Sequence, residues 1–451
     1  MSAGSALILA AGKGTRMRSV RPKVLHTLAG IAMIDLVVDA IRGAGATPTV
    51  VVSRDADTVR EHLDGVATVV QDPPLGTGHA VQVALPVLPG EGEAFIVYGD
   101  TPLLRAETLR QMQQLHRERG AVLTLLSARV PPPSAYGIVE RATDGTVTRI
   151  VETKPDPELQ RTSAERNLGA YVVDLSWLRR AAPRLQRNAS GEVYLTDLPA
   201  LAAADGKVVA AFCLDDPREG MGVNSRDELA AAEALLRARI RERHMLAGVT
   251  LRDPASTFID AGVSIGEDTE LLPGTILEGQ TRIGRGCVIG PRSRLRDTIV
   301  GDRSRIGESY LEGATLEEEV SIGPYCHIRT GTYLARGVDI LDHAEIKNSR
   351  LGRGTKVHHF SYLGDATIGA DVNVGAGTIT ANYDGKKKLA TVIEDGVFLG
   401  VDTMLVAPVR IGRRAKTGAG AVVTKDVAPG MLAVGVPARA IKRVVPEADL
   451  Q

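Results

Sequence analysis

The sequence predicts two folds in series, a Rossmann-like α/β domain followed by a parallel β-helix. Three observations support this prediction. Short β-rich runs alternate with helical segments through about the first 225 residues. One long helical stretch follows, and after about residue 250 an aliphatic residue recurs at every sixth position. The chain of 451 residues is also too long for one ordinary core.

Five β-rich runs are expected to form the strands of the first domain. Between them, residues 33–45 and 107–120 place apolar side chains at helical spacing. This alternation favours a parallel sheet that helices cover on both faces, with ligands bound at the carboxyl ends of the strands. The runs occupy residues 6–12, 47–53, 67–72, 93–100 and 121–130.

Residues 224–246 predict a single long helix, because they are rich in alanine, leucine and arginine and contain no glycine or proline. Ser225 and Glu228 stand three residues apart at its start, as in a capping box. We expect the domain junction here. The predicted parts are a first domain of residues 1–226, a linker helix of residues 227–248 and a second domain of residues 249–451.

The second domain follows a six-residue repeat whose phase shifts and then resumes. Such a repeat predicts a β-helix with three faces per turn and the aliphatic residues stacked inside. The repeat breaks between Thr380 and Ile393 for an inserted loop that holds Asn382, Tyr383 and three lysines. Insertions of this kind often bind ligands. The repeating residues are Ile265, Leu271, Leu277, Ile283, Ile289, Leu295, Ile322, Ile328, Leu334, Ile340, Ile346, Val357, Leu363, Ile393, Leu399, Leu405 and Ile411.

The chain carries 54 basic and 54 acidic residues, so no net charge favours nucleic acid or an anionic membrane as a partner. No apolar run reaches the roughly 18 residues of a membrane span. No basic residue precedes the apolar run at the start, which argues against a signal peptide. Cys213, Cys287 and Cys326 lie far apart without CxxC spacing, which favours a reducing cytoplasm over disulfides or a zinc cluster.

The stretch "LILAAGKGTRM" places a glycine-rich loop after the first strand. Gly12 and Gly14 allow backbone amides to approach an anion, and Lys13 and Arg16 can neutralise it, although such a loop can also be a simple tight turn. Met17 leaves the dinucleotide-binding pattern incomplete. The longer run "GKGTRMRSVRPKVLHTLAG" resembles the signature of sugar-phosphate nucleotidyltransferases.

The ordered motifs of both halves resemble the family of bacterial bifunctional N-acetylglucosamine-1-phosphate uridylyltransferases/glucosamine-1-phosphate N-acetyltransferases. Among them are "QDPPLGTGHAV", "YGDTPLL", "GEVYLTD", "IGPYCHIRTG" and "YLGDATIGADVNVGAGTITANYDG". The resemblance covers essentially the whole chain and implies a left-handed β-helix. It implies acetylation of glucosamine 1-phosphate by acetyl-CoA, then coupling of N-acetylglucosamine 1-phosphate to UTP. It further implies Mg²⁺ as cofactor, a homotrimer and a cytoplasmic location.

The resemblance also assigns the uridylyltransferase residues. Lys23 and Arg16 would face the triphosphate as catalytic cations. Asp100 and Asn224 would bind Mg²⁺, although a strand-end aspartate and an asparagine before a helix can be ordinary loop and cap residues. The UDP-N-acetylglucosamine site would comprise Leu9, Ala10, Ala11, Gly12, Lys23, Gln71, Gly76, Thr77, Tyr98, Gly99, Asp100, Gly137, Glu152, Asn167 and Asn224.

For the acetyltransferase, the motif H-x-x-Y-L-G-D selects His359 as the general base, three residues before Tyr362. Its neighbour His358 would be a bystander, because neighbours on a strand face opposite sides. Val401 stands where the family often has a serine at a coenzyme A contact, and Arg439 is a candidate for a basic contact in the tail. The other acetyl-site positions are Arg329, Lys347, Tyr362, Asn373, Ala376, Asn382, Tyr383 and Ala419.

Two alternatives remain open at the level of sequence. One is another sugar-nucleotide pyrophosphorylase, such as an adenylyl- or thymidylyltransferase, whose β-helix serves only oligomerisation. Those tails are typically shorter and lack the combination of His359 with Asn382 and Tyr383. The other alternative is a non-catalytic scaffold, which does not explain why basic and hydroxyl residues cluster between residues 329 and 383.

Overall fold

The computed structural model describes residues 4–12, 14–153, 156–162, 164–189 and 191–444. The chain divides into two compact units, Met1–Leu236 and Arg237–Gln451, and the division falls inside the long helix α8 (Arg226–Leu246). The predicted domain limits at residues 226 and 248 flank this division and stay a prediction. Within the described ranges, no helix has both the length and the apolar character needed to cross a bilayer.

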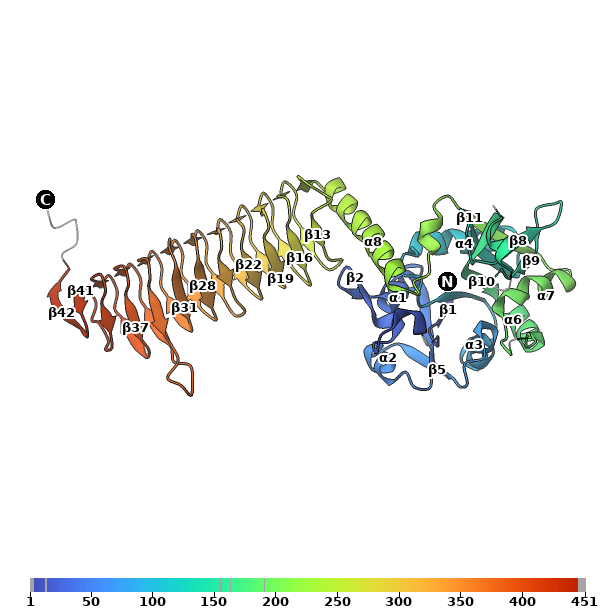
Figure 1. The fold of residues 1–451 in the computed structure, drawn as a ribbon, viewed down its shortest axis with the longest axis horizontal. Helices are drawn as coiled ribbons and strands as arrows, with labels where there is room; N and C mark the ends of the chain where they lie inside the picture. The colour runs from blue at the N-terminus through green and yellow to red at the C-terminus, as the bar shows by residue number, and fades with distance from the viewer. Residues whose placement is uncertain (1–3, 13, 154–155, 163, 190, 445–451) are drawn as a thin grey trace. The chain divides into compact units, whose positions relative to one another are not determined.

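The first unit is built on one mixed sheet with the strand order β11-β7-β10-β6-β1-β4-β5, and β8 pairs with β9 and β10 (Figure 1). The five predicted strands appear as β1, β4, β5, β6 and β7. The strands span β1 (Gly4–Leu9), β4 (Ala46–Ser53), β5 (Ala67–Gln71), β6 (Glu93–Tyr98), β7 (Leu123–Val130), β8 (Ile138–Arg141), β9 (Val147–Val151), β10 (Ala164–Asp174) and β11 (Val209–Leu214).

The expectation of a parallel sheet holds for β1, β4, β5 and β6 and is wrong for β10. That strand runs antiparallel to both β6 and β7, between which it lies. The reason is the connection before it. The chain leaves β7, forms the antiparallel hairpin of β8 and β9, and returns along β7. An antiparallel return of this kind needs no crossover helix.

Helices cover both faces of this sheet, as the alternation of strands and helices predicted. Neighbouring residues of β1 point to opposite sides, so Leu7 and Ile8 belong to two separate apolar cores. Ile8 packs with residues of α1, α2 and α4, and Leu7 packs with residues of α3, α6 and α7. These helices span α1 (Met33–Gly43), α2 (Asp57–His62), α3 (Thr77–Ala84), α4 (Ala106–Glu118), α6 (Leu175–Ala181) and α7 (Leu198–Ala204).

The start of α8 is fixed to the first unit by its cap and by its first turns. The Glu228 carboxylate accepts the backbone N–H of Ser225 at 3.2 Å, which is one half of the predicted capping box. Ala232 is fully buried in a small core with residues of the first unit, and the Glu233 carboxylate accepts the backbone N–H of Ala29 at 2.8 Å. The first half of α8 is therefore part of the first unit.

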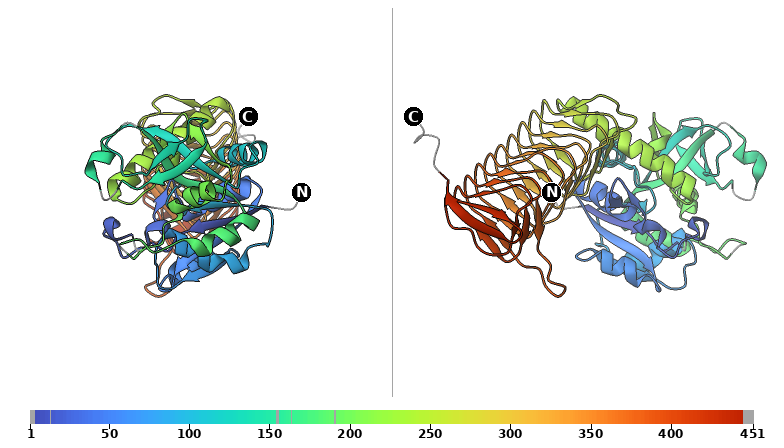
Figure 2. Two further views of the ribbon diagram at one scale, coloured as in Figure 1. Left: turned by 90° about the vertical axis from the view of Figure 1, so that its right-hand side faces the viewer. Right: turned by 60° about the vertical axis from the view of Figure 1, so that its left-hand side comes forward.

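The second unit is a parallel β-helix, as the six-residue repeat predicted. Three sheets of short strands run from β12 (Thr250–Leu251) to β42 (Ala438–Arg443) (Figure 2). Consecutive strands belong to different sheets until the last pair, in which β41 (Met431–Gly435) and β42 run antiparallel in one sheet. Leu271, Leu277 and Ile283 lie on successive faces and are buried inside. Leu271 pairs with Ile289, but Leu295 already pairs with Leu311. Some turns are thus shorter, which explains the shift in the phase of the repeat.

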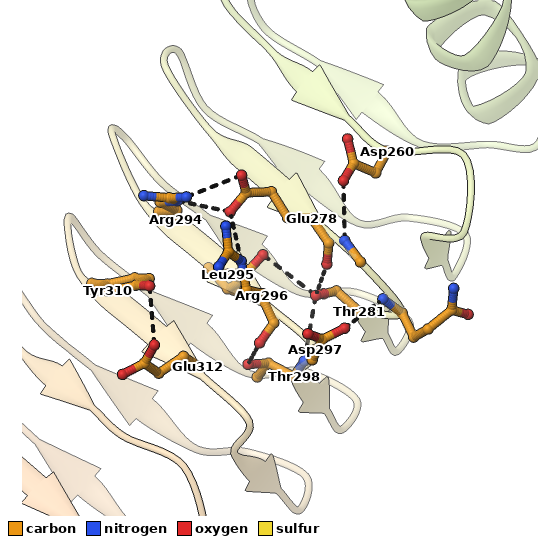
Figure 3. Close-up of polar contacts among 12 residues, drawn as sticks. Asp260, Glu278, Thr281, Arg294, Leu295, Arg296, Asp297, Thr298, Tyr310 and Glu312 are labelled. Carbon is orange, nitrogen blue, oxygen red and sulfur yellow. Dashed lines mark hydrogen bonds and ion pairs between the residues drawn. The ribbon is translucent and has the colours of Figure 1, made fainter. Parts of the chain in front are cut away.

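Polar side chains connect successive turns of the β-helix at its corners and on its outer face (Figure 3). The buried Thr281 donates its hydroxyl to the Glu278 carbonyl at 2.8 Å. The Glu278 carboxylate accepts a hydrogen bond from Arg294 one turn later at 2.7 Å. The Asp297 carboxylate accepts the backbone N–H of Gln280 at 2.9 Å. Buried corner groups are thereby satisfied, and each turn is held against the next.

The packing of α8 predicts where the first unit can be cut. A fragment that ends at Leu246 should keep a stable first unit, whereas one that ends at Ala230 should melt at a lower temperature. The shorter fragment loses the buried Ala232 and the carboxylate of Glu233, and such losses typically cost about 1–3 kcal/mol. Thermal unfolding of the two fragments checks this, and equal melting temperatures would contradict it.

Candidate active sites

Most residues predicted for the nucleotide lie at one edge of the first sheet. The strands β1, β4, β5 and β6 are parallel, so their carboxyl ends meet at the same edge. Leu9, Gln71 and Tyr98 are the last residues of β1, β5 and β6. Directly after these ends come Ala10, Ala11 and Gly12, then Gly76 and Thr77 at the start of α3, then Gly99 and Asp100.

At this edge a lysine joins the two predicted metal ligands. Lys23, in a short helical turn (Lys23–Leu25), forms an ion pair with the Asp100 carboxylate and donates to the Asn224 side-chain oxygen at 3.1 Å. The backbone N–H of Val223 also donates to the Asp100 carbonyl at 2.8 Å. A Cβ at Gly14 would lie 2.6 Å from the Lys23 Cβ, so the glycine gives the lysine room to approach. Three segments distant in sequence thus converge on one ammonium group.

The donor set of this cluster fits Mg²⁺. A carboxylate oxygen of Asp100 and the amide oxygen of Asn224 both face the Lys23 ammonium, so they already surround a positive charge. Mg²⁺ is usually bound by one or two protein oxygens together with substrate phosphate oxygens and water. Within the described residues, no group of three or more His, Cys, Asp or Glu side chains could hold a metal by itself.

The predicted base and ribose residues belong to a connected polar network. The Gln71 amide, 2% exposed, donates to the Gly76 carbonyl at 2.9 Å. The Thr77 hydroxyl accepts the backbone N–H of Leu195 at 3.1 Å. The Tyr98 hydroxyl bonds to the hydroxyl of Thr77, and burial raises the pKa of Tyr98 to about 12. The phenol therefore stays neutral and available for hydrogen bonding at ordinary pH.

The network continues to the predicted sugar residues through Tyr171, which the sequence did not single out. Tyr171 is buried, bonds to Tyr98 and accepts the side-chain amide of Asn167 at 2.8 Å. The backbone N–H of Asn167 donates to the Gly137 carbonyl at 2.9 Å. Glu152 directly follows β9, and its carboxylate accepts the Thr196 hydroxyl at 2.7 Å. The predicted nucleotide and sugar positions therefore share one hydrogen-bonded frame.

One predicted catalytic cation is not drawn into this cluster. Arg16 is exposed in a helical turn (Thr15–Met17) and makes no hydrogen bond or ion pair with any other residue that the structure describes. Gly12 also borders open space, since an added Cβ would meet nothing within 4 Å. Lys13 lies outside the described residues. The glycine-rich loop thus presents an exposed arginine and open backbone at the edge of the sheet.

In the second unit, the histidine doublet lies at a corner and not on a strand, so the strand argument for their orientation was wrong. His358 and His359 connect β30 (Lys356–Val357) to β31 (Ser361–Gly364), because the strands of this β-helix are too short to include them. Their partners nevertheless differ. His358 Nε2 lies 2.8 Å from an Asp339 oxygen, whereas His359 Nδ1 lies 3.8 Å from Asp342, and the His359 side chain is 60% exposed. His359 is the freer imidazole.

Tyr362 and Asn382 meet beside Gly364. A Cβ on Gly364 would lie 2.4 Å from the Tyr362 hydroxyl oxygen and 2.5 Å from the Asn382 side-chain nitrogen. The buried Asn382 donates to the Asp365 carboxylate at 2.6 Å, and Asn348 donates to the other oxygen of that carboxylate at 2.6 Å. Asp365 thus holds the base of the inserted loop, and Gly364 leaves room for the two side chains.

The inserted loop connects β34 (Ile379–Ala381) to β35 (Thr391–Ile393) and projects from the stack of turns (Figure 1). Tyr383 and Lys388 form an antiparallel bridge across it, and the Lys388 ammonium lies 4.5 Å from the centre of the Tyr383 ring. Tyr383 is 57% exposed. The loop therefore has a defined shape and presents an aromatic side chain and cationic groups to its surroundings.

The other predicted acetyl-site residues are spread over the prism. Arg329 forms an ion pair with Glu345 at 2.7 Å, and Glu345 pairs with Tyr362 in the same sheet. Lys347 pairs with Gly364 there, whereas Asn373 belongs to another sheet.

The corner of His359 stacks on that of Ala376, where the Gly377 N–H donates to the Phe360 carbonyl at 2.8 Å. The stack continues through Val401 to the corner of Ala419, and Arg439 is exposed in β42.

Comparison with known families matches both units. A model of the MobA-like NTP transferase domain matches residues 6–163. A model of the bacterial transferase hexapeptide (six repeats) matches residues 262–297, and one of the hexapeptide repeat of succinyl-transferase matches residues 390–425. The nucleotidyltransferase character of the first unit and the hexapeptide-transferase character of the second, both predicted from motifs, are thereby confirmed.

Individual relatives match along nearly the whole chain. The bifunctional protein GlmU of Heliobacterium modesticaldum is 48% identical over 434 residues, which are 95% of this chain and 95% of that protein. The protein of the same name from Rubrobacter xylanophilus is 48% identical, over 97% of this chain and 94% of its own. That from Trichlorobacter lovleyi is 46% identical, over 96% of both. The chain belongs to the GlmU family, which confirms the predicted union of an N-acetylglucosamine-1-phosphate uridylyltransferase with a glucosamine-1-phosphate N-acetyltransferase.

Proposed function

We propose that the two activities occupy separate units of the chain. Uridylyl transfer would take place at the edge of the first sheet, and acetyl transfer on the β-helix. The observation that carries the first assignment is the convergence of Lys23, Asp100 and Asn224 on one ammonium group. The second assignment rests on Tyr362 and Asn382, which meet beside Gly364 in the only part of the β-helix where the motif H-x-x-Y-L-G-D occurs.

At the first site, a phosphate oxygen of N-acetylglucosamine 1-phosphate attacks the α-phosphorus of UTP. The bond from that phosphorus to the pyrophosphate oxygen breaks, and UDP-N-acetylglucosamine and pyrophosphate result. Two anions must approach each other, so positioning and charge neutralisation supply most of the catalysis. Lys23 and the exposed Arg16 are the side chains we assign to neutralise the phosphates.

The remaining residues of the first site would bind and orient. Asp100 and Asn224 would hold Mg²⁺, which neutralises phosphate charge when it is bound. Leu9 to Gly12, Gln71, Gly76 and Thr77 would hold the uridine. Tyr98 and Gly99 would border the phosphates, and the sugar would contact Gly137, Glu152 and Asn167. The hydrogen-bonded frame from Thr77 to Gly137 supports this division, because it fixes the distance between the residues assigned to the uridine and those assigned to the sugar.

At the second site, the amine of glucosamine 1-phosphate attacks the thioester carbonyl of acetyl-CoA. The carbon–sulfur bond breaks, and a base takes the amine proton and passes it to the departing sulfur, so that the coenzyme leaves as a thiol. His359 is the group we assign as this base, because its imidazole is exposed and makes no close hydrogen bond. Arg329 and Lys347 supply positive charge for the sugar phosphate, and Tyr362 and Asn382 supply polar contacts.

We further propose that neighbouring copies in a homotrimer complete the acetyl site. Tyr362 and Asn373 lie in different sheets of one prism, and the corner of Ala376 and Ala419 is not the corner of Asn382. A single small ligand does not reach residues on separate faces of one chain. A second copy that places its own corner against Tyr362 brings these groups together, and a three-sided prism suits threefold packing.

A cytoplasmic location also remains part of the proposal. Its support is the chemistry of the cysteines, since Cys287 and Cys326 are buried, Cys213 is exposed, and all three are free thiols. Free thiols are usual where glutathione and thioredoxin keep the surroundings reducing.

Replacement of Asp100 tests the first site. Asp100→Ala should lower UTP-dependent pyrophosphate release about a hundredfold or more, because the metal would lose its carboxylate ligand. Acetylation of glucosamine 1-phosphate should be retained. Asp72→Ala, which removes an exposed ion pair with Arg54, is the control and should leave both rates unchanged. An equal fall of both activities in the Asp100 variant, with the fold intact, would contradict separate sites.

The histidine doublet tests the second site. His359→Ala should reduce acetyl transfer about 10²–10⁴-fold, the usual cost of a lost general base, and leave uridylyl transfer unchanged. Its residual rate should rise with pH, as hydroxide and buffer take over the proton. His358→Ala, which removes only the contact with Asp339, should stay within a few-fold of the parent. The account is wrong if coenzyme A release is equally sensitive to the two substitutions.

The space at Gly364 gives an independent test of the second site. Gly364→Ala should lower acetyl transfer up to about a hundredfold, because the new methyl group displaces the Tyr362 hydroxyl or the Asn382 amide. Gly307→Ala is the matched control, since its Cβ would make only an ordinary contact of 3.7 Å with Ile322. Comparison of acetyl-transfer rates and melting temperatures separates the two. Parent-like activity of the Gly364 variant would exclude a role for this pair.

A further inference from the structure

Arg166, in β10, is a buried cation without an acidic partner. Its side chain is 0% exposed, and no carboxylate among the described residues forms an ion pair with it. Burial lowers the pKa of the Arg166 guanidinium, because desolvation disfavours the charged form. Maintaining such a charge inside a protein costs stability unless other groups satisfy it. The groups that surround the Arg166 guanidinium therefore indicate its role.

Backbone carbonyls from both ends of one segment accept hydrogen bonds from the two terminal nitrogens of the guanidinium, whereas its Nε–H has no partner among the described residues. It donates to the Tyr136 carbonyl at 2.9 Å, to the Leu159 carbonyl at 2.9 Å and to the Thr162 carbonyl at 2.8 Å. Tyr136 precedes β8, and Leu159 and Thr162 follow β9. We name residues 134–153 and 156–162 the sugar-side segment. Arg166 joins its two ends, together with the backbone hydrogen bond from the Ser134 N–H to the Gln160 carbonyl at 2.9 Å. A planar group with several donors suits such a multiple contact.

The sugar-side segment carries residues assigned above to the amino sugar. Gly137 adjoins Tyr136, and its carbonyl accepts the backbone N–H of Asn167, the residue after Arg166. Consecutive residues of β10 therefore hold consecutive residues of the segment. The Tyr136 carbonyl also accepts the Thr153 hydroxyl at 3.3 Å, next to Glu152. Gly137 and Glu152 are accordingly fixed through Tyr136.

Tyr136 links this arrangement to the phosphate side of the site. Its hydroxyl accepts the backbone N–H of Gly222 at 3.0 Å. Gly222 is followed by Val223, whose N–H donates to the Asp100 carbonyl at 2.8 Å, and then by Asn224. One tyrosine thus connects the carbonyl held by Arg166 to the segment before α8 that carries a proposed metal ligand.

We propose that Arg166 is a positioning residue for the sugar 1-phosphate in the uridylyl reaction. By closing the sugar-side segment against β10, it holds Gly137 and Glu152 where the N-acetyl amino sugar binds. The proposal rests on the assignment of Gly137, Glu152 and Asn167 to the sugar. Arg166 itself touches no substrate, and its influence passes through the backbone of Tyr136.

The test compares Michaelis constants in the full chain. Arg166→Met removes the donors and keeps the apolar bulk, and it should raise the KM for N-acetylglucosamine 1-phosphate about tenfold or more. The KM for UTP should change less than about twofold, because the Arg166 side chain bonds to none of the residues assigned to the uridine. Amide hydrogen exchange should become faster within residues 134–162 and stay unchanged elsewhere in the first sheet. Acetyl transfer should match the parent and thereby report an intact second unit.

Arg179 offers a matched control on α6. Its guanidinium also binds backbone carbonyls, those of Leu88 at 2.6 Å and Pro89 at 2.9 Å, away from the sugar-side segment. Arg179→Met should leave both Michaelis constants unchanged. A parent-like sugar KM in Arg166→Met, or an equal rise in both constants, would overturn the proposal. If the first unit of that variant does not fold, Arg166→Lys carries the same test, since it keeps the charge and loses the planar fork.

Glu152→Gln distinguishes failure of this inference from failure of the sugar site itself. If that variant keeps a parent-like sugar KM, the assigned sugar residues are wrong and the role of Arg166 falls with them. If Glu152→Gln raises the sugar KM and Arg166→Met does not, the sugar site stands and the positioning role is wrong. We expect each of the two substitutions to raise the KM for N-acetylglucosamine 1-phosphate more than the KM for UTP.

Discussion

The first unit depends on the pairing of one lysine with two oxygen ligands. Lys23 comes from the segment after β1, Asp100 from the end of β6 and Asn224 from the entry to α8, and all three meet at one ammonium group. An ion pair of this kind, largely shielded from water, is stronger than a surface pair. It keeps an acidic and an amide oxygen facing a cation before any substrate arrives. Reorganisation on binding is thereby reduced, which is the basis of electrostatic catalysis.

In the second unit, too, one carboxylate holds the polar side chains of the proposed site in place. Its inner residues stack uniformly, so the site depends on the few places where the repeat is broken. Asp365 holds Asn348 and Asn382 with one carboxylate, and it thereby fixes the base of the inserted loop. Gly364 leaves the adjoining space open for Tyr362. A rigid stack with a local irregularity is a common way for a repetitive fold to carry a specific site.

Much of this could be predicted from the sequence, because the relevant signals are periodic or local. The six-residue repeat gave the β-helix, and the strand-end positions of Gln71, Tyr98 and Asp100 follow from parallel strands sharing an edge. The reversal of β10 could not be predicted, since a hairpin and a crossover leave similar alternation in the sequence. Tyr171 and Arg166 were missed for a related reason. Their roles arise from burial beside residues distant in sequence, which no local pattern reveals.

The central claim is that Asp100 and Asn224 are the cation ligands of the uridylyl site and that Lys23 holds their place. A crystal structure with UDP-N-acetylglucosamine, and with Mn²⁺ in place of Mg²⁺ for its anomalous signal, tests this most directly. The account predicts an anomalous peak about 2.0–2.3 Å from oxygens of Asp100, Asn224 and the phosphates, with Lys23 turned from Asp100 to a phosphate. A peak elsewhere, or a Lys23–Asp100 pair that persists beside bound substrate, would contradict it.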